Sequence, residues 1–136
     1  MSNKKSLEAK IAKRIARKKS VVLLRKDFKD LGGYDQVGRA LRNLTRKGTI
    51  MNIGYGLYAR ARISPLTGQL VPEKNLPQLA KEALRRLGVR TVPSSMDRDY
   101  NAGRTTQVPT GRLIAIKGRV SRKIGYHGTY INFEAA

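Results

Sequence analysis

The chain has 136 residues, enough for one ordinary domain or for a small domain with an appendage, and 40% of them are hydrophobic, as in a folded protein. It contains 29 Lys and Arg against 9 Asp and Glu, a formal net charge of +20, and a chain this basic usually binds a polyanion. The lack of cysteine excludes disulfides, thiolate zinc sites and thiol nucleophiles, and the single histidine excludes a histidine-based metal cluster.

The positive charge is concentrated in the first half of the chain. Residues 1–62 hold 17 basic and 4 acidic residues, whereas residues 63–136 hold 12 and 5. The longest strongly apolar run near the start is Val21–Leu24, which is far too short for a signal peptide or a membrane span. We therefore expect a cytoplasmic protein without membrane contact, whose first half binds the polyanion.

The opening segment predicts one helix and one strand. Ser6 is a suitable N-cap, and Leu7, Ile11 and Ile15 recur four residues apart, so they form a narrow apolar stripe on a basic helix. A helix of this length needs a docking partner to stay folded. The aliphatic run Val21–Leu24 predicts a short buried strand.

A second helical region is expected in two pieces. Lys26–Leu31 predicts a short helix that ends at two glycines. A longer helix should begin at Asp35, a good N-cap, and end at Gly48, with an apolar side turned inward and a basic side opposite. The apolar side consists of Val37, Ala40, Leu41 and Leu44, and the opposite side of Arg39, Arg42, Asn43 and Arg46.

The run "TIMNIGYGLYARA" predicts a hairpin. It contains two β-prone segments joined at Gly54–Gly56, where the glycines can adopt positive φ. Helix, strand, short helix, helix and hairpin is the element order of a winged helix-turn-helix, a DNA-binding fold. We assign residues 1–62 to this domain.

The remaining chain predicts a linker and a second unit. Residues 63–75 contain three turn-forming Pro and Gly residues and predict a linker. Pro77 suits the first turn of an amphipathic helix that Gly88 closes. Short β-prone runs broken by Pro and Gly then predict three or four strands. Residues 76–136 are expected to form a helix and a small, mostly antiparallel β unit, so the fold class is α+β.

The long basic helix has the two sides that a DNA-reading helix requires. The major groove admits one α-helix, which presents some side chains to base edges while it packs on its own domain. Arg39 or Arg42 could contact guanine, and the amides of Gln36 and Asn43 suit adenine. Neighbouring basic residues and the hydroxyl of Tyr55 could contact phosphates. The expected DNA contacts are Lys13, Arg14, Arg17, Arg25, Lys26, Gln36, Arg39, Arg42, Asn43, Arg46, Lys47, Tyr55 and Arg60.

The basic surface is also compatible with roles that involve no DNA. A charge run is usually a solvated face, and Tyr55 could be only a turn residue. An RNA or ribosomal partner would select the same net charge, but RNA duplexes hide their major groove, so binding would survive loss of the Arg39 and Arg42 side chains. A protein that neutralises an acidic partner by charge alone would not discriminate among polyanions.

The sequence carries no pattern typical of an enzyme. His127 lies between glycines and predicts a turn residue, while Asp97 and Asp99 lie in a polar segment that predicts a loop with surface carboxylates. The glycines form neither a P-loop nor a dinucleotide-binding fingerprint. We expect no catalytic residues, no metal and no cofactor.

The segment "DFKDLGGYDQVGRALRNLTRKGTIMNIGYGLYARARISPLTGQLVP" resembles the N-terminal winged-helix domain of the AbiEi-like antitoxins of bacterial type IV toxin–antitoxin systems. The later segment with "TQVP" before a set of β-prone runs is similar to the same family. The resemblance implies a repressor of its own operon that binds repeats in the promoter. It also implies an antitoxin that opposes a nucleotidyltransferase-like toxin without a required direct contact. The DNA contacts that it implies fall on Gln36–Lys47 and Gly54–Tyr58.

Overall fold

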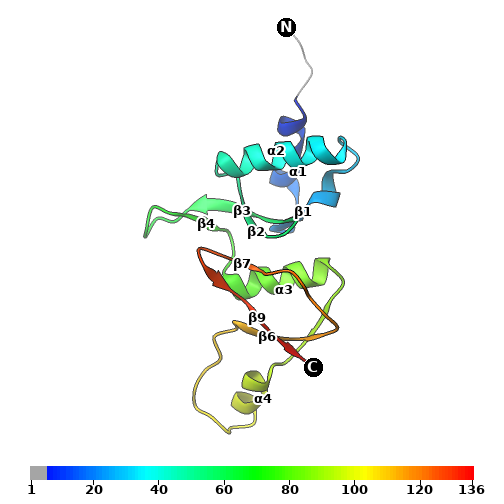
Figure 1. Cartoon of the computed structure of the whole chain (residues 1–136). Coiled ribbons are helices and arrows are strands. Elements are labelled where there is room, and N and C mark those ends of the chain that lie inside the picture. Colours follow the sequence, from blue (N-terminus) through cyan, green and yellow to red (C-terminus); the bar gives the residue numbers. More distant parts are fainter. Residues whose placement is uncertain (1–5) are drawn as a thin grey trace. The chain divides into compact units, whose positions relative to one another are not determined.

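The computed structural model describes residues 6–136 (Figure 1). The chain divides into two compact units, Met1–Lys74 and Asn75–Ala136, and each mixes helices with short strands. The α+β class is thus confirmed. The first unit ends later in the chain than the sequence predicted, because its sheet includes one more strand.

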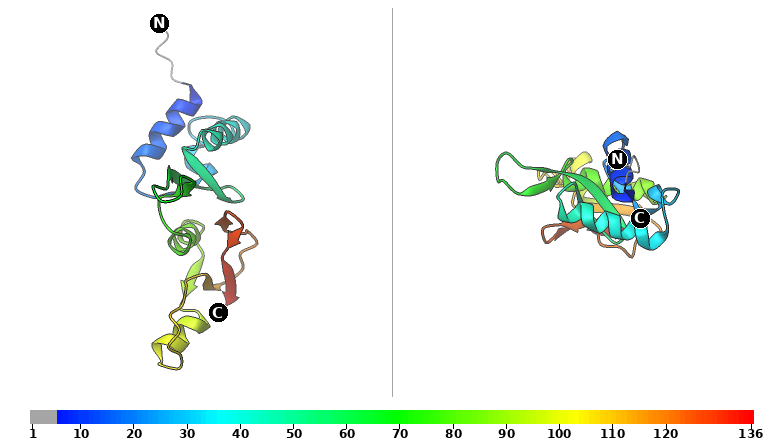
Figure 2. Two further views of the ribbon diagram at one scale, coloured as in Figure 1. Left: turned by 90° about the vertical axis from the view of Figure 1, so that its left-hand side faces the viewer. Right: turned by 90° about the horizontal axis from the view of Figure 1, so that it is seen from above.

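The first unit opens with α1 (Leu7–Arg17), as predicted. The Oγ of Ser6 accepts a hydrogen bond from the N–H of Ala9 at 3.1 Å, so this residue is the N-cap. Ile11 and Ile15 are buried, and the basic residues of the helix lie on its other sides. Figure 2 shows α1 crossing the second helix of the unit above its strands.

Between the two helices lie β1 (Val22–Leu24) and η1 (Arg25–Phe28), a single 3-10 turn. The short helix predicted over Lys26–Leu31 is a 3-10 helix that begins one residue earlier and ends three residues sooner, so only its extent was wrong. The carboxylate of Asp27 accepts a hydrogen bond from the N–H of Leu24 at 2.9 Å and tightens the turn at its start. Phe28 is fully buried, so the turn is fixed by its one large apolar side chain.

The second helix, α2 (Tyr34–Arg46), begins earlier than predicted. Gly33 occupies the N-cap position, and the side chain of Gln36 accepts its N–H at 3.2 Å. Asp35 is therefore not the N-cap but an exposed residue of the first turn. The helix ends as predicted, since Gly48 follows the C-cap with φ of 79°.

Three further strands complete the sheet of the first unit: β2 (Ile50–Gly54), β3 (Leu57–Ile63) and β4 (Leu70–Pro72). Their hydrogen-bonded order is β1-β3-β2, all antiparallel, and β4 pairs with the far end of β3. The predicted β2–β3 hairpin is confirmed, with Gly56 at φ of 67° in its turn.

The pairing of β4 overturns the predicted linker over residues 63–75. Ile63 lies opposite Leu70 and Ala61 opposite Pro72, so this segment is a hairpin of the first unit. The first unit consequently ends at Lys74 and not at residue 62. The Pro and Gly residues that suggested a linker instead belong to this hairpin.

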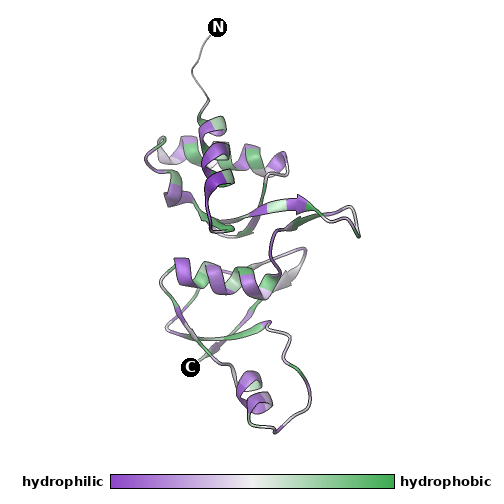
Figure 3. Ribbon diagram, turned by 180° about the vertical axis from the view of Figure 1, so that it is seen from behind, coloured by the Kyte–Doolittle hydropathy of each residue, from purple (hydrophilic) through white to green (hydrophobic). Residues whose placement is uncertain are grey.

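One apolar core joins the helices of the first unit to its sheet. The buried side chains come from α1, β1, η1, α2 and β2. Figure 3, which colours the ribbon by hydropathy, shows both apolar and hydrophilic residues along each helix of this unit. This core cluster comprises Ile11, Ile15, Leu23, Phe28, Val37, Ala40, Leu41, Leu44 and Ile50. Because α1 has only a narrow apolar stripe, its attachment to α2 depends on few residues.

The second unit is a helix on a small sheet. It contains α3 (Leu76–Arg86), β5 (Arg90–Val92), α4 (Ser95–Asn101), β6 (Leu113–Lys117), β7 (Gly125–Tyr126), β8 (Thr129–Tyr130) and β9 (Asn132–Ala135). In the sheet, β6 lies between β5 and β9; it is antiparallel to β5 but parallel to β9, and β7 and β8 form a separate hairpin.

Two features of the second unit differ from the prediction. The segment with Asp97 and Asp99 is a helix, because Ser94 and Asp97 form a reciprocal capping box at its start. One of the pairings in the sheet is parallel, so the main sheet is mixed. His127 is a turn residue, as predicted, and has φ of 51°.

We predict that Gly125→Ala destabilises the second unit by about 3 kcal/mol, because its Cβ would lie 2.1 Å from the carbonyl oxygen of Thr129 in the paired strand. Urea unfolding of the full chain measures the loss. His127→Gly is the matched change in the same hairpin, and it should not destabilise the unit because it relieves a positive φ. Equal stability of Gly125→Ala and the unchanged protein would contradict the prediction.

Candidate nucleic-acid interface

The outward side of α2 carries a straight row of charged residues. Asp35, Arg39, Arg42 and Arg46 follow one another at helical spacings of four, three and four residues, so they lie along one face. All four side chains are exposed, whereas the opposite face of the helix is buried in the core. We name these residues the α2 row.

The arginines of the α2 row are not engaged elsewhere. In the part of the chain that the structure describes, Arg39, Arg42 and Arg46 form no ion pair or hydrogen bond through their side chains. Three guanidinium groups on one exposed helix face repel one another and present planar sets of donors outward. Such a row suits an anionic surface with hydrogen-bond acceptors.

The side of α2 next to the row faces α1. Lys47 forms an ion pair with Glu8, and Asn43 also hydrogen-bonds this carboxylate. The hydrogen bond from Lys47 is the largest cause that holds the pKa of Glu8 below its ordinary value. Together with Gln36, whose side chain caps α2, these residues fix the helix instead of extending from it. Gln36, Asn43 and Lys47 were expected to contact DNA, and the structure gives all three internal partners.

Arg14 of α1 is also held within the unit. Its guanidinium donates to both carboxylate oxygens of Asp30, at 2.5 and 2.9 Å, and to the carbonyl oxygen of Asp27 at 3.0 Å. The hydrogen bond from Arg14 lowers the pKa of Asp30. Arg14 therefore connects α1 to η1 and the segment after it. A contact of this guanidinium with DNA would compete with these hydrogen bonds.

Arg25 lies over the start of α2. Its guanidinium stacks 3.4 Å from the centre of the Tyr34 ring and donates to the carbonyl oxygen of Tyr34 at 2.6 Å. A Cβ at position 38 would lie 2.1 Å from Nη2 of Arg25. The lack of a side chain at Gly38 therefore leaves room for the arginine. Arg25 was also expected to contact DNA and is instead a contact between η1 and α2.

Arg60 of β3 is mostly buried, with 19% of its side chain exposed. Its guanidinium donates to the carbonyl oxygens of Ile15 at 3.1 Å and Lys18 at 2.5 Å, which end α1, and to the carboxylate of Glu73 at 3.0 Å. Arg60 was expected to flank the DNA from the hairpin, and the structure turns this side chain toward α1 through the alternation of β3.

The remaining expected contacts stay on the surface. Lys13, Arg17, Lys26 and Tyr55 are all exposed, and 80% of Tyr55 is accessible to solvent. Lys13 and Arg17 belong to the border of a hollow of about 400 Å³ along α1. Its lining consists of Lys10, Lys13, Arg14, Arg17, Lys18 and Leu31. This basic hollow and the α2 row are the two cationic surfaces of the unit that the expected residues form.

The sequence pattern missed the role of Asp35. It was expected to cap the helix, but its carboxylate lies in line with the three arginines. At about 100° per residue Asp35 lies only about 40° from Arg39 around the helix, so this position could be predicted from the sequence once the helix start was known.

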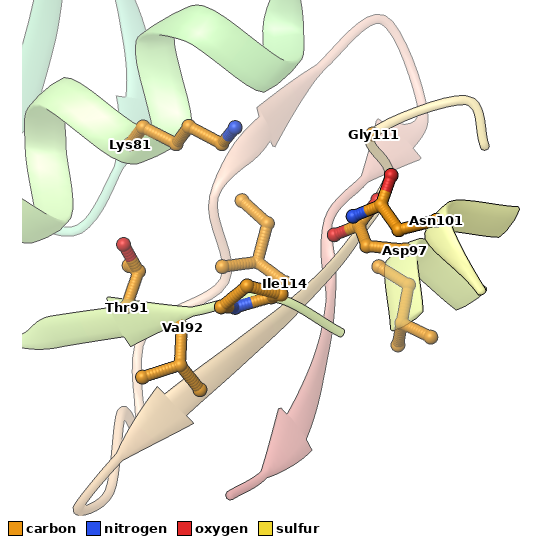
Figure 4. A pocket seen from close by; sticks show the side chains of 9 residues that line it. Lys81, Thr91, Val92, Asp97, Asn101, Gly111 and Ile114 are labelled. Atoms are coloured by element: carbon orange, nitrogen blue, oxygen red, sulfur yellow. The ribbon is translucent and has the colours of Figure 1, made fainter. Parts of the chain in front are cut away.

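A separate pocket of about 380 Å³ lies within the second unit (Figure 4). Val92, Leu113 and Ile114 form its apolar part, while Lys81 and Asn101 contribute polar groups from two helices. Asp97 also lines it, and one oxygen of this carboxylate accepts the N–H of Ser94 at 3.0 Å. The lining contains no histidine or serine that could act with this carboxylate.

Residues 6–136 carry neither a metal-binding cluster nor a helical membrane span. No three His, Asp or Glu side chains of this range are grouped so that they could hold a metal ion. No helix within the same range has the length and apolar character that crossing a membrane requires.

A protein-family model matches residues 10–136, and the chain belongs to this family of unknown function, DUF6088. The match begins within α1 and covers both units. No curated protein matches the chain significantly. No solved structure does so either.

We predict that Arg60→Ala lowers the free energy of unfolding by about 1–3 kcal/mol, because the carbonyl oxygens that end α1 lose their buried donor. Urea unfolding measures the change. Arg62→Ala, two residues along the same strand and exposed, is the matched control and should change stability by no more than about 0.5 kcal/mol. Similar losses from both variants would contradict this role of Arg60.

We also predict a pH dependence of the contact between α1 and α2. Because the pKa of Glu8 is lower in the folded protein than in the unfolded chain, its ion pair stabilises the fold above the ordinary pKa of the carboxyl. This contribution disappears as the pH falls through the folded value. An NMR titration of the Glu8 carboxyl should show a lowered midpoint that returns toward the ordinary value in Lys47→Ala. Asp30, held by Arg14, should keep its midpoint in that variant; an unchanged Glu8 midpoint would contradict the prediction.

Proposed function

We propose that the protein binds duplex DNA sequence-selectively and represses transcription through a winged helix-turn-helix formed by its first unit. The observation that carries the proposal is the α2 row. One face of α2 is buried in the core, and the other presents three arginines without internal partners in the described chain. A helix with this division fits the major groove, where side chains reach base edges.

The order of elements supports the same proposal. α1, β1, η1, α2 and the β2–β3 hairpin follow one another as the elements of a winged helix-turn-helix do, and β1 pairs with β3. One part is unusual: η1, a single 3-10 turn, would take the place of the second helix of that fold. Phe28 at the end of this turn is fully buried and anchors the chain before α2 in the core.

In this mechanism the α2 row reads bases and the basic hollow positions the protein. Arg39 and Arg42 are the candidates for bidentate contacts to guanine, and the carboxylate of Asp35 could accept from the N4 amino group of cytosine. Lys13 and Arg17 would contact phosphates alongside, together with Lys26 of η1. The phosphate contacts fix the register of the helix and make the binding salt-dependent.

The regulatory part of the proposal depends on the resemblance to AbiEi-like antitoxins. The segment "ALRNL..KG.I", which contributes to that resemblance, covers the second half of α2 and reaches the first residue of β2. On this basis the protein would occupy repeats in the promoter of its own operon and repress it. A nucleotidyltransferase-like toxin encoded beside it would be opposed without a required direct contact.

We predict that Arg39→Ala or Arg42→Ala weakens binding to the cognate site by about 1–3 kcal/mol and relaxes its sequence preference, because a bidentate contact to a base is lost. Arg17→Ala is the matched control: it should weaken cognate and scrambled duplexes alike and reduce the salt slope by about 1. Titration of labelled duplex from upstream of the reading frame, against scrambled duplex and structured RNA, measures both effects.

The competitors decide between DNA and RNA as the partner. A preference for the upstream duplex by a factor on the order of 10³ supports a specific repressor. Tighter binding to structured RNA that survives loss of Arg39 and Arg42 would favour the RNA-binding alternative. Equal competition by all three nucleic acids would show that the α2 row attracts polyanions without sequence selectivity.

A further inference from the structure

The hairpin between β3 and β4 extends away from the helices of its unit, as Figure 1 and the right-hand view of Figure 2 show. Its last strand pair is Ile63 with Leu70, and residues 64–69 form the tip beyond it. We name residues 63–70 the β3–β4 arm. Leu66 at the tip is 94% exposed and Ile63 at its base 61% exposed. Leu66 is thus the most exposed of the large hydrophobic side chains that the structure describes.

The tip is held in a defined conformation by hydrogen bonds. The N–H of Ser64 donates to the carbonyl of Gln69 at 2.8 Å, and the N–H of Gly68 to the carbonyl of Ser64 at 2.9 Å. The Oγ of Ser64 accepts from the N–H of Leu66 at 3.2 Å, and the Oγ1 of Thr67 accepts from the N–H of Gln69 at 3.2 Å. Leu66 is thus presented to solvent by an ordered turn.

The β3–β4 arm leaves the unit beside the end of α2. A Cβ on Gly48, which terminates the helix, would lie 3.5 Å from Cδ1 of Leu70 at the end of the arm. Arg46 of the α2 row is two residues before this glycine. Arg62, also exposed, lies at the other side of the arm's base, opposite Val71. The base of the arm therefore lies beside the C-terminal end of the α2 row.

Charge favours nucleic acid over a second copy of the chain as that ligand. Residues 1–74 hold 18 basic and 5 acidic residues, so two first units repel each other and attract a phosphate backbone. In the described part of the first unit, the other large exposed hydrophobic residues are Tyr34 and Tyr55. Two aliphatic side chains without a matching apolar surface are far less than the roughly 800 Å² that each partner of a stable dimer buries.

We propose that the β3–β4 arm enters the minor groove next to the major groove occupied by α2, and that Leu66 inserts there as an apolar wedge. The inference rests on the proposed DNA binding. Leucine and proline side chains between base steps partly unstack the bases and kink the duplex, and Pro65 precedes Leu66 at the tip. The neighbouring Arg62 contacts phosphate at the edge of that groove. The arm, not the short turn at Tyr55, is then the main wing.

The test compares Leu66→Ala with Val108→Ala in the full chain. Val108 is another exposed aliphatic residue, 65% accessible, and lies in the second unit, so it is a matched truncation. The probe is an upstream duplex with a donor and an acceptor dye on its two ends, whose energy transfer reports bending. We expect the unchanged protein and Val108→Ala to bend the duplex alike. Leu66→Ala should bend it less and bind it on the order of tenfold more weakly.

Three outcomes overturn the inference, and they separate its failure from that of the proposed function. If Leu66→Ala binds and bends the duplex as the unchanged protein does, the wedge is absent. If Leu66→Ala instead changes the sedimentation of the protein without DNA, the arm is a contact between protein copies. If the unchanged protein does not prefer the upstream duplex, both the DNA-binding proposal and the wedge fail. Thermal unfolding of Leu66→Ala shows whether the variant is as well folded as the unchanged protein.

Discussion

Arg60 joins three parts of the first unit through one guanidinium group. It donates to the carbonyl oxygens at the end of α1, lies on β3, and pairs with Glu73 just after β4. The carbonyl oxygen of Ile15 also accepts the N–H of Lys18 at 3.3 Å, but without the arginine both carbonyl oxygens would lose a donor that water cannot easily replace at a mostly buried position. The position of α1 over the sheet, and with it the basic hollow, depends on this contact.

Several of the other cations of the first unit also serve its own structure. Arg14 is held by Asp30, Arg25 by the ring and carbonyl of Tyr34, and Lys47 by Glu8. Few acidic residues are present, and those of the first unit mostly lie where they neutralise such a cation. The net charge therefore overstates the surface available for binding. Among the cations that remain exposed, Arg39, Arg42 and Arg46 lie along one face of α2, and Lys13 and Arg17 border the hollow along α1.

The sequence was sufficient for the local features of the fold. Spacing of apolar residues located α1, α2 and α3, and glycines with positive φ ended helices or closed turns where they were expected, as at Gly48 and Gly56. It was not sufficient where distant segments compete for the same groups. β4 pairs with β3 across a turn whose Pro and Gly residues predict a linker from sequence alone. The roles of Arg14, Arg25 and Arg60 depend on partners 9 to 45 residues away along the chain.

The same distinction applies to the candidate site. Helical periodicity predicted which side of α2 faces outward, since 3.6 residues per turn fixes that side once the core is known. It could not show that Gln36 and Asn43, at its margin, are used to cap α2 and to hold Glu8. An exposed position and an available functional group are different properties, and only the first follows from the period.

The parallel pairing of β6 with β9 has a consequence for how the protein acquires its structure. All residues of the first unit are present once the ribosome has added Lys74. The sheet of the second unit cannot form completely before β9, Asn132–Ala135, pairs with β6. Loop closure over such separations slows folding, and unpaired strand edges are exposed in the meantime. During synthesis the first unit can therefore fold, with its cationic surfaces already formed, while the second is still an open chain.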